Sequence, residues 1–204
     1  MVEQGALEKR YTGNGIGGSN PSPTAIIIFM KNHKVLILTG PGGSGKSTIA
    51  KLLSNKYGYV LIDGDQFDTE FFPDGGQWFP ENKENLERAH NKIFAETKKE
   101  FNSGKNVVID YIIFGEHLSF FDKFKKEFGN NLEIRVLFPR EEKTVLRDKN
   151  RHCWTTGTER IRIVREEFIK IKKDIGEENF IDISDQTPEE TLEQFFKFMT
   201  NPSI

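Results

Sequence analysis

The chain has 204 residues, of which 36% are hydrophobic and 29% charged, and its formal net charge is −2. This length and composition fit one globular domain with a sizeable core, and the near-neutral charge argues against bulk binding of nucleic acid or a membrane surface. One cysteine, Cys153, excludes an internal disulfide framework, and no apolar run approaches the ~20 residues of a membrane-spanning helix. We therefore expect a cytoplasmic protein, either a monomer or a homodimer.

Residues 1–29 differ in composition from the rest of the chain. Residues 1–24 are rich in Gly, Asn, Ser and Pro, and they lack both an apolar period and the apolar centre of a secretory signal, while Ala25–Phe29 is a short apolar run. This composition predicts a disordered tail. Gly18–Pro21 matches the T-arm of a transfer-RNA gene read as protein, and Met30 lies just ahead of the first predicted strand. We hypothesise that translation starts at Met30 and that the tail is a gene-model artefact, with a genuine tail as the alternative. Residues 30–204 are then expected to form a single domain.

The most specific motif follows the first predicted strand, Val35–Thr39, which is short and apolar. Gly40–Ser47 fits the pattern G-x-x-x-x-G-K-[ST], and Ile49–Leu53 reads as the first turns of a helix. In this context the loop N–H groups and the helix N-terminus form a cradle for phosphate, whereas a purely structural glycine turn is the alternative. Lys46 then reaches the β- and γ-phosphates, and the Ser47 hydroxyl coordinates Mg²⁺. The residues predicted to bind ATP here are Gly40, Gly42, Gly43, Ser44, Gly45, Lys46, Ser47 and Thr48.

Strands and helices alternate after this loop. Helices are predicted at residues 46–56, 82–103, 116–128, 141–149 and 159–175, and a last helix starts with Thr187 as N-cap and Pro188 at its first position. Further strands are predicted at residues 59–63, 106–110, 133–138 and 179–183. Five apolar strands separated by helices predict an α/β protein with three layers, in which a parallel sheet carries helices on both faces.

Carboxylates stand at the ends of two predicted strands. One strand ends in Asp63-Gly-Asp65 and the next in Asp110, while Asp182 is expected inside the last strand. Ligands of open α/β sheets bind at the carboxyl ends of the strands, and phosphoryl transfer needs a group that orients or deprotonates the acceptor hydroxyl. Asp63 or Asp65 can supply that group, and Asp110 with Ser47 can hold Mg²⁺. A turn or a helix cap is the alternative for any strand-end aspartate.

These segments resemble the P-loop small-molecule kinases, a group that includes shikimate, gluconate and adenylylsulfate kinases and chloramphenicol phosphotransferase. The resemblance rests on Gly40–Thr48, Leu61–Asp65 and an arginine-bearing segment from Leu146 to Arg162, within residues 34–199. It implies the P-loop NTPase fold, with strand order 2-3-1-4-5 and a short lid. It also implies transfer of the γ-phosphoryl group of ATP to a hydroxyl or phosphate of a small molecule. In these families an aspartate after the second strand contacts the acceptor hydroxyl, and Asp63 and Asp65 both remain candidates.

The same resemblance places a mobile lid between the fourth strand and the helix at residues 159–175. In these kinases lid arginines close over ATP, which implies that Arg151 stabilises the transferring phosphoryl group and that Arg147 lies on the adenine or phosphate side. Arginines on a solvent-exposed helix face are the alternative. Trp154 lies within this lid, and the adenine loop of the family falls at Ser184–Thr187. The predicted catalytic set is therefore Lys46, Asp63, Asp65 and Arg151.

The acceptor side is poorly specified by the sequence. The segment from Phe67 to Pro80 should cover the acceptor. Its aromatic residues either line a pocket for a ring-bearing molecule or plug the domain against water: Phe67, Phe71, Phe72 and Trp78. His117 is a further candidate for the pocket wall. No basic cluster in this segment indicates a carboxylate or sulfate acceptor.

Other functions compete with a small-molecule kinase. A P-loop ATPase or switch commonly has Glu directly after the aspartate of the third strand, but Tyr111 follows Asp110 here, and the guanine-binding string N-K-x-D is absent from the sequence. A nucleic-acid end kinase would favour a basic groove, which a net charge of −2 does not supply. A nucleotide-binding protein without turnover would not need the intact carboxylates. The sequence does not identify the acceptor.

Overall fold

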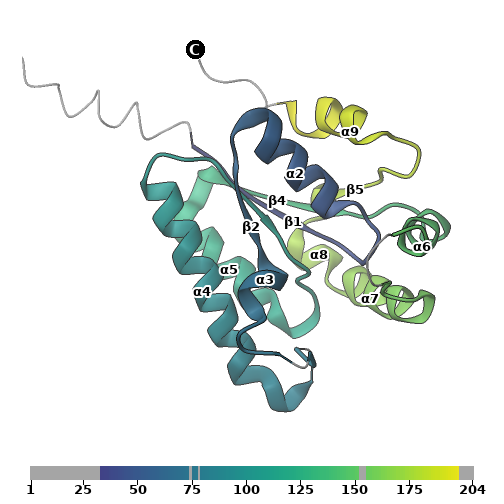
Figure 1. The fold of residues 1–204 in the computed structure, drawn as a ribbon, viewed down its shortest axis with the longest axis horizontal. Helices are drawn as coiled ribbons and strands as arrows, with labels where there is room; N and C mark the ends of the chain where they lie inside the picture. Colours follow the sequence, from purple (N-terminus) through teal and green to yellow (C-terminus); the bar gives the residue numbers. More distant parts are fainter. Residues whose placement is uncertain (1–32, 74, 78, 152–154, 198–204) are drawn as a thin grey trace, which may run out of the picture.

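The structure, a computed structural model, describes residues 33–73, 75–77, 79–151 and 155–197. Across these residues the chain forms an α/β fold in which one five-stranded sheet lies between two layers of helices (Figure 1). The predicted tail, Trp78 and Trp154 lie outside the described residues, and the single domain at residues 30–204 stays a prediction. Within the described part, no helix is both long and apolar enough to cross a bilayer.

The strands run parallel in the order β2-β3-β1-β4-β5, which confirms the expected order 2-3-1-4-5. Their bounds are β1 (Val35–Thr39), β2 (Val60–Asp63), β3 (Val107–Asp110), β4 (Leu132–Leu137) and β5 (Phe180–Ile181). In the register of the sheet, Asp110 pairs with Leu38 of β1 on one side and with Asp63 of β2 on the other. Since β1 continues directly into the phosphate loop, this register brings both strand-end aspartates to the edge where that loop begins.

Eight α-helices fall within the described residues. They are α2 (Lys46–Tyr57), α3 (Gly64–Asp68), α4 (Lys83–Asn102), α5 (Leu118–Phe128), α6 (Glu141–Lys149), α7 (Thr158–Lys170), α8 (Lys172–Ile175) and α9 (Pro188–Phe195). Short 3-10 turns lie at Pro80–Asn82, Gly115–His117, Gly129–Asn131 and Glu177–Asn179. The predicted start of α9 is confirmed, because Glu190 N donates to the Thr187 hydroxyl and Thr187 N donates back to the Glu190 carboxylate.

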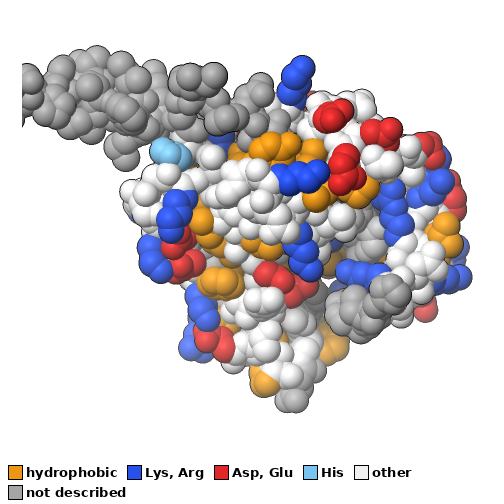
Figure 2. All heavy atoms as spheres, turned by 45° about the horizontal axis from the view of Figure 1, so that its top comes forward, with side chains coloured by type: hydrophobic (Ala, Val, Ile, Leu, Met, Phe, Trp, Pro, Cys, Tyr) orange, Lys and Arg blue, Asp and Glu red, His pale blue; other side chains and the backbone are white. Residues whose placement is uncertain are grey.

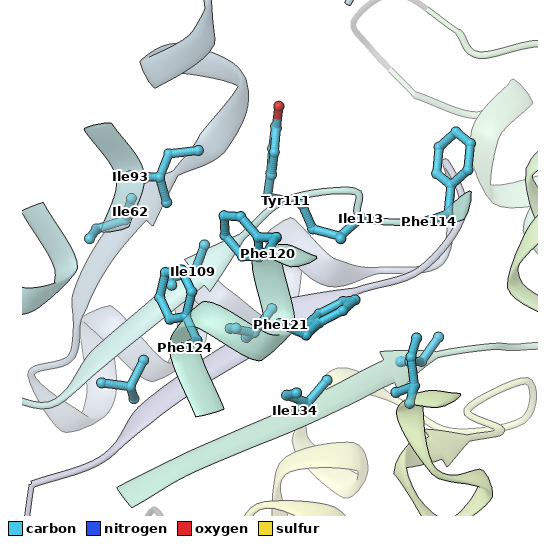
Figure 3. Packing of buried hydrophobic residues seen from close by; sticks show 14 of the residues in the cluster. Ile62, Ile93, Ile109, Tyr111, Ile113, Phe114, Phe120, Phe121, Phe124 and Ile134 are labelled. Atoms are coloured by element: carbon cyan, nitrogen blue, oxygen red, sulfur yellow. The ribbon is translucent and has the colours of Figure 1, made fainter. Parts of the chain in front are cut away.

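Each face of the sheet has its own core. On one face, α2 and α9 pack through Ile49, Leu53, Leu192 and Phe196 against alternate residues of β1 and β3. On the other face, α4, α5 and α7 bury a larger cluster that contains Phe120, Phe121 and Phe124 (Figure 3). The rings of Phe120 and Phe124 stack with their centroids 4.6 Å apart. Burial on both faces explains why β1 is apolar from Val35 to Leu38.

The string Asp63-Gly-Asp65 opens α3, and Asp63 caps this helix by accepting from Gln66 N at 3.4 Å, which is the helix cap that the sequence left open as an alternative. Two local predictions differ from the structure. β5 ends at Ile181, so the prediction that Asp182 lies inside the last strand is wrong; Asp182 instead accepts from Ser184 N at 2.8 Å and turns the chain. The helix predicted at residues 159–175 is broken at Ile171, which separates α7 from α8.

Candidate active site

The phosphate loop is held tightly by the elements around it. Gly43 has a positive φ of 77°, and a Cβ there would lie 2.5 Å from the Thr144 carbonyl oxygen of α6. A Cβ at Gly42 would lie 2.2 Å from the Thr156 hydroxyl oxygen. Side chains at these two positions would therefore push away α6 and Thr156 of the predicted lid. The two glycines thus allow the phosphate loop to pack closely against α6 and Thr156. We call the end of α6 together with Arg151, Thr156 and Gly157 the lid base.

Lys46 lies folded against the phosphate loop. Its ammonium donates to the carbonyl oxygens of Gly40, at 2.9 Å, and Pro41, at 3.1 Å, and the residue is 8% exposed. Burial lowers the pKa of Lys46, while the negative charges of Asp110 and Asp65 oppose that shift. The lysine thus lies within electrostatic reach of Asp65 and Asp110, two of the carboxylates that the sequence singled out. A phosphate group in the loop would offer this buried cation a charged partner in place of two neutral carbonyls.

Asp65 differs from the other carboxylates of this edge. Asp65 is exposed to solvent, although neighbouring atoms displace part of the water around its carboxylate. This desolvation, followed by repulsion from Asp68 and Asp63, raises its pKa to about 6. Burial also raises the pKa of Asp63, with repulsion from Asp110 next, but the Asp63 carboxylate is occupied in capping α3. A solvent-accessible carboxylate with a pKa near neutral pH suits proton transfer better than a carboxylate that is hydrogen-bonded in a helix cap. The geometry therefore favours Asp65 over Asp63 as a candidate base.

Carboxylates and cationic side chains face each other across a hollow in the surface (Figure 2). A cavity of about 410 Å³ lies beside the phosphate loop, and it brings together three separate parts of the chain. Gly45, Lys46, Ser47 and Thr48 come from the loop and α2, Arg147 and Arg151 from α6 and its end, and Ile183, Gln186, Pro188 and Thr191 from the segment after β5. Most of the predicted nucleotide-binding residues thus line one cavity, and this volume falls in the range of small-ligand sites.

Arg147 and Arg151 have different surroundings within this cavity. Arg147 donates to the carbonyl oxygen of Ile183 at 2.9 Å, so it holds the backbone directly before the predicted adenine segment. Arg151 lies near the buried lysine, since its charge contributes to the lowered pKa of Lys46. Of the two arginines, Arg151 is therefore placed on the phosphate side and Arg147 on the opposite side of the cavity. The roles that the resemblance implied for Arg147 and Arg151 stay predictions.

The cavity has the groups that a nucleotide with Mg²⁺ would need. The hydroxyl of Ser44 is buried without a hydrogen bond to any described residue, as expected for a donor in a loop that binds phosphate. Mg²⁺ usually binds through one or two protein oxygens plus substrate phosphates. The Ser47 hydroxyl and the buried Asp110 carboxylate, which is 8% exposed, would supply such oxygens. The residues present therefore fit both groups.

Sequence reasoning missed Asp148, the residue that ties the lid base together. Its carboxylate accepts from Thr156 N at 3.1 Å, from Gly157 N at 3.0 Å and from Arg151 Nη1 at 3.4 Å, and the residue is 1% exposed. Burial by itself raises the pKa of Asp148, but these donors outweigh burial and leave the pKa below its usual value. Asp148 lies in a charged stretch typical of a solvated helix face, and its main-chain partners are eight and nine residues away. The sequence therefore carried no signal for it.

We predict that Asp148→Asn loosens the lid base. The amide keeps one acceptor oxygen but loses the charge that pairs with Arg151, which should destabilise the protein by about 1.5–3 kcal/mol at pH 7. The pKa of Asp148 is lower in the folded protein than in the unfolded chain. The wild-type carboxylate therefore stabilises the fold at pH values above the pKa of the unfolded chain, and this stabilisation is lost as the pH falls through the pKa of the folded protein. Urea unfolding at a series of pH values from 7 downward measures this difference in the free energy of unfolding. Asp122→Asn, whose side chain is 75% exposed, is the control; equal stability of both variants would contradict the role of Asp148.

The aromatic residues of the acceptor segment mostly plug the fold. Phe72 is 5% exposed and packs with Leu86 and Ala89 of α4. Phe71 packs on the same cluster beneath the Arg88 guanidinium, 5.1 Å from its ring centroid, and Phe67 is partly buried against the main core. The open choice between lining a pocket and excluding water is therefore decided for these three residues in favour of packing. His117, by contrast, lines a cavity on the acceptor side.

The fold and this site define a P-loop nucleotide-binding protein. The family model AAA_33, described as an AAA domain, matches residues 35–173, so the chain belongs to this P-loop family. The match begins with β1 and extends into α8, and it therefore includes the phosphate loop, the strand-end aspartates and both lid arginines. The resemblance to P-loop small-molecule kinases is confirmed at this level.

Known kinases match this chain locally in sequence and broadly in fold. Shikimate kinase from Chlorobium phaeobacteroides is 60% identical over 37 residues, 18% of this chain and 20% of that protein. The chain thus matches about a fifth of the length of this curated relative. A sugar kinase from Janibacter sp. HTCC2649 superimposes with a TM-score of 0.64 at 16% identity, covering 82% of this chain and 94% of that one. Shikimate kinase from Acinetobacter baumannii, in complex with shikimate, gives a TM-score of 0.58 at 16% identity over 85% and 96% of the chains. Such low identities support the shared fold alone.

Proposed function

We propose that this protein is an ATP-dependent kinase that transfers the γ-phosphoryl group to a hydroxyl of a small molecule. One observation carries the proposal: Asp65, accessible to solvent and with a pKa of about 6, lies within electrostatic reach of the phosphate-loop lysine Lys46. A switch or a simple nucleotide-binding protein needs the lysine but has no use for a carboxylate tuned to take a proton near neutral pH. A phosphate acceptor remains within the same class of reaction.

The proposed chemistry assigns one task to each residue. The acceptor hydroxyl loses its proton to Asp65, its oxygen forms a bond to the γ-phosphorus, and the bond from that phosphorus to the bridging oxygen breaks to release ADP. Lys46 and Arg151 balance the negative charge on the transferring group. Asp63 keeps Asp65 in place by capping α3. Bound Mg²⁺ would neutralise phosphate charge, with Ser47 and Asp110 as its protein ligands.

A hydrolysing ATPase fits these residues less well. In such an enzyme a carboxylate directly after the third-strand aspartate activates water, but this position holds Tyr111. The tyrosine is 1% exposed, and its hydroxyl donates to Asp68 at 3.0 Å. Its ring also fills the space over Gly64, where a Cβ would lie 2.2 Å from a ring carbon. The position is therefore used for packing and cannot orient a water molecule at the phosphates.

The experiment that tests this proposal measures ADP release with Mg²⁺ and ATP in the presence of individual metabolites that carry hydroxyl groups. We expect ADP release to rise strongly above the background with at least one acceptor and to yield a phosphorylated product in equal amount, detected by mass spectrometry. The same assay with Lys46→Met identifies any contaminating kinase. Steady ATP hydrolysis that no acceptor changes, and that depends on Lys46, would overturn the proposal in favour of an ATPase.

A further inference from the structure

The chain after β5 forms an uncharged wall of the nucleotide cavity. Its cationic lining residues come from the start of α2 and from α6 and its end, whereas the residues after β5 that line it carry no charge: Ile183, Gln186, Pro188 and Thr191. The phosphates of a nucleotide need cations and loop N–H groups, so the uncharged wall is the part of the cavity left for the ribose and the base. We call residues 182–187, between β5 and α9, the base-side segment.

The base-side segment contains no helix or strand, so side chains have to fix its shape. The Asp182 carboxylate accepts from Ser184 N at 2.8 Å and also from the Ser184 hydroxyl. Ser184 is 6% exposed, so its hydroxyl is largely shielded from water. The two bonds hold the chain in a turn directly after β5.

The region of α6 holds the same segment through three consecutive residues. Arg147 Nη2 donates to the carbonyl oxygen of Ile183 at 2.9 Å. Arg140, which directly precedes α6, donates from its backbone N to the Ser184 hydroxyl oxygen at 2.7 Å. Its Nη2 donates to both carboxylate oxygens of Asp185 at 2.8 Å. Each residue from Ile183 to Asp185 is thus bonded to α6 or to the residue just before it.

These bonds differ in how much they can stabilise the segment. The side chains of Arg140 and Asp185 are 46% and 65% exposed, so water and salt weaken their ion pair, and Lys143 also approaches Asp185 at 3.4 Å. The bond from Arg140 N to Ser184 is partly buried, and Ser184→Ala would leave that N–H without its acceptor. Since a buried donor without a partner is costly, Ser184 should contribute more than the ion pair.

Arg140 and Ser184 can affect a bound nucleotide only indirectly. Neither is among the residues that line the cavity, but Ile183, next to Ser184, does line it. A Cβ at Gly45 would lie 3.5 Å from the Ile183 side chain, so that side chain lies against the phosphate loop. A displacement of residues 183–185 would therefore move one wall of the cavity relative to the phosphate loop.

We infer that Arg140 and Ser184 are positioning residues for the nucleoside half of the bound nucleotide. They hold the base-side segment in one conformation before the nucleotide binds, so binding does not have to order this segment. This inference rests on the proposed function, in which ATP occupies this cavity. The phosphates bind to the loop and to the cations, so their binding should not depend on these two residues.

The test compares two ligands that both carry three phosphates but differ in the nucleoside. The full chain with Mg²⁺ is titrated with a non-hydrolysable ATP analogue and, separately, with inorganic triphosphate, and calorimetry gives both dissociation constants. Ser184→Ala should weaken binding of the ATP analogue about tenfold and change the affinity for triphosphate less than about twofold. Equal weakening of both ligands would show that the substitution acts on the phosphate loop or on the whole fold, and it would overturn the inference, as would unchanged affinity for the analogue.

Arg140→Gln tests the exposed ion pair of the same cluster. It keeps the bond from the backbone N to Ser184 and removes the pair with Asp185, so the ATP analogue should bind about threefold more weakly at low salt, with triphosphate unaffected. Lys98→Gln is the matched control, because Lys98 is 44% exposed and pairs with Glu127 at 2.6 Å between α4 and α5. No loss in Arg140→Gln, or an equal loss in Lys98→Gln, would contradict the role of Arg140. If the wild type binds no ATP analogue, the proposed function fails too; if it does and Ser184→Ala weakens both ligands alike, the kinase proposal stands and the inference alone fails.

Discussion

Replacing Lys46 with methionine is expected to reduce phosphoryl transfer by about 100-fold or more while the fold is kept. The lysine is the buried cation of the phosphate loop, and loss of one preorganised charge or donor at a transferring group typically costs this much in kcat. Methionine has a similar length and no charge, so it can occupy the same channel beside Gly40 and Pro41. The measurement is acceptor-dependent ADP release, with ATP binding followed by a fluorescent analogue.

The same variant should not lower the melting temperature. Burial lowers the pKa of Lys46, which means that the folded state disfavours the charged form, so the charge costs stability at neutral pH. Removing it trades two hydrogen bonds to carbonyls for relief of that cost. Lys56→Met, on the same helix and with a side chain 48% exposed, is the control for both activity and melting. Near wild-type turnover in Lys46→Met would show that the phosphate loop is not the site of transfer.

The features that could be predicted from the sequence depend mostly on residues that are neighbours along the chain. The phosphate loop needs a strand, a run of glycines and a helix in direct succession, and all three are contiguous between Val35 and Tyr57. The five strands are short apolar runs bounded by turns, which is also a local signal. The order of the strands was not local information, and it came from the resemblance that the glycine loop suggested.

The features that the sequence did not reveal depend on partners far along the chain. Asp68 is paired with Tyr111, 43 positions later, and nothing near either residue indicates the contact. α3 has only five residues, too few for an apolar period to appear, so the sequence left a helix cap at Asp63 as an alternative and did not predict the helix itself. The sequence also did not indicate which aromatic residues of the segment from Phe67 to Pro80 are buried. Phe72 and Phe79 belong to one segment, yet one is 5% exposed and the other 60%.

The fold also explains why the sequence left both Asp63 and Asp65 as candidates for the base. Both Asp63 and Asp65 follow β2, and both have a raised pKa for the same leading reason, desolvation at the crowded edge of the sheet. Only the hydrogen bonds separate them, because Asp63 is engaged with Gln66 N, whereas Asp65 stays accessible to solvent. Because only the Asp63 carboxylate is engaged in the helix cap, we expect effects of very different size from Asp65→Asn and Asp63→Asn.

Asp65→Asn is expected to reduce acceptor-dependent transfer by about 100- to 10,000-fold with ATP binding retained, since an amide cannot take the proton of the acceptor hydroxyl. In the wild type, kcat should rise with pH through about 6, where Asp65 becomes ionised, and the residual activity of Asp65→Asn should lack this step. Asp63→Asn should have a much smaller effect, because asparagine caps a helix about as well as aspartate does. The measurement is the pH dependence of kcat for all three proteins.

Stability gives an independent check on the same carboxylate. The folded pKa of Asp65, about 6, is above its ordinary value of 3.8, so the folded protein binds a proton that the unfolded chain has released between these two values. Stability from this group therefore falls as the pH rises through that window. Asp65→Asn should melt higher than the wild type at pH 7.5, and the difference should vanish near pH 4. If Asp63→Asn instead abolished transfer and Asp65→Asn kept the wild-type pH profile, the proton would go to Asp63, and the cap on α3 would be the catalytic carboxylate.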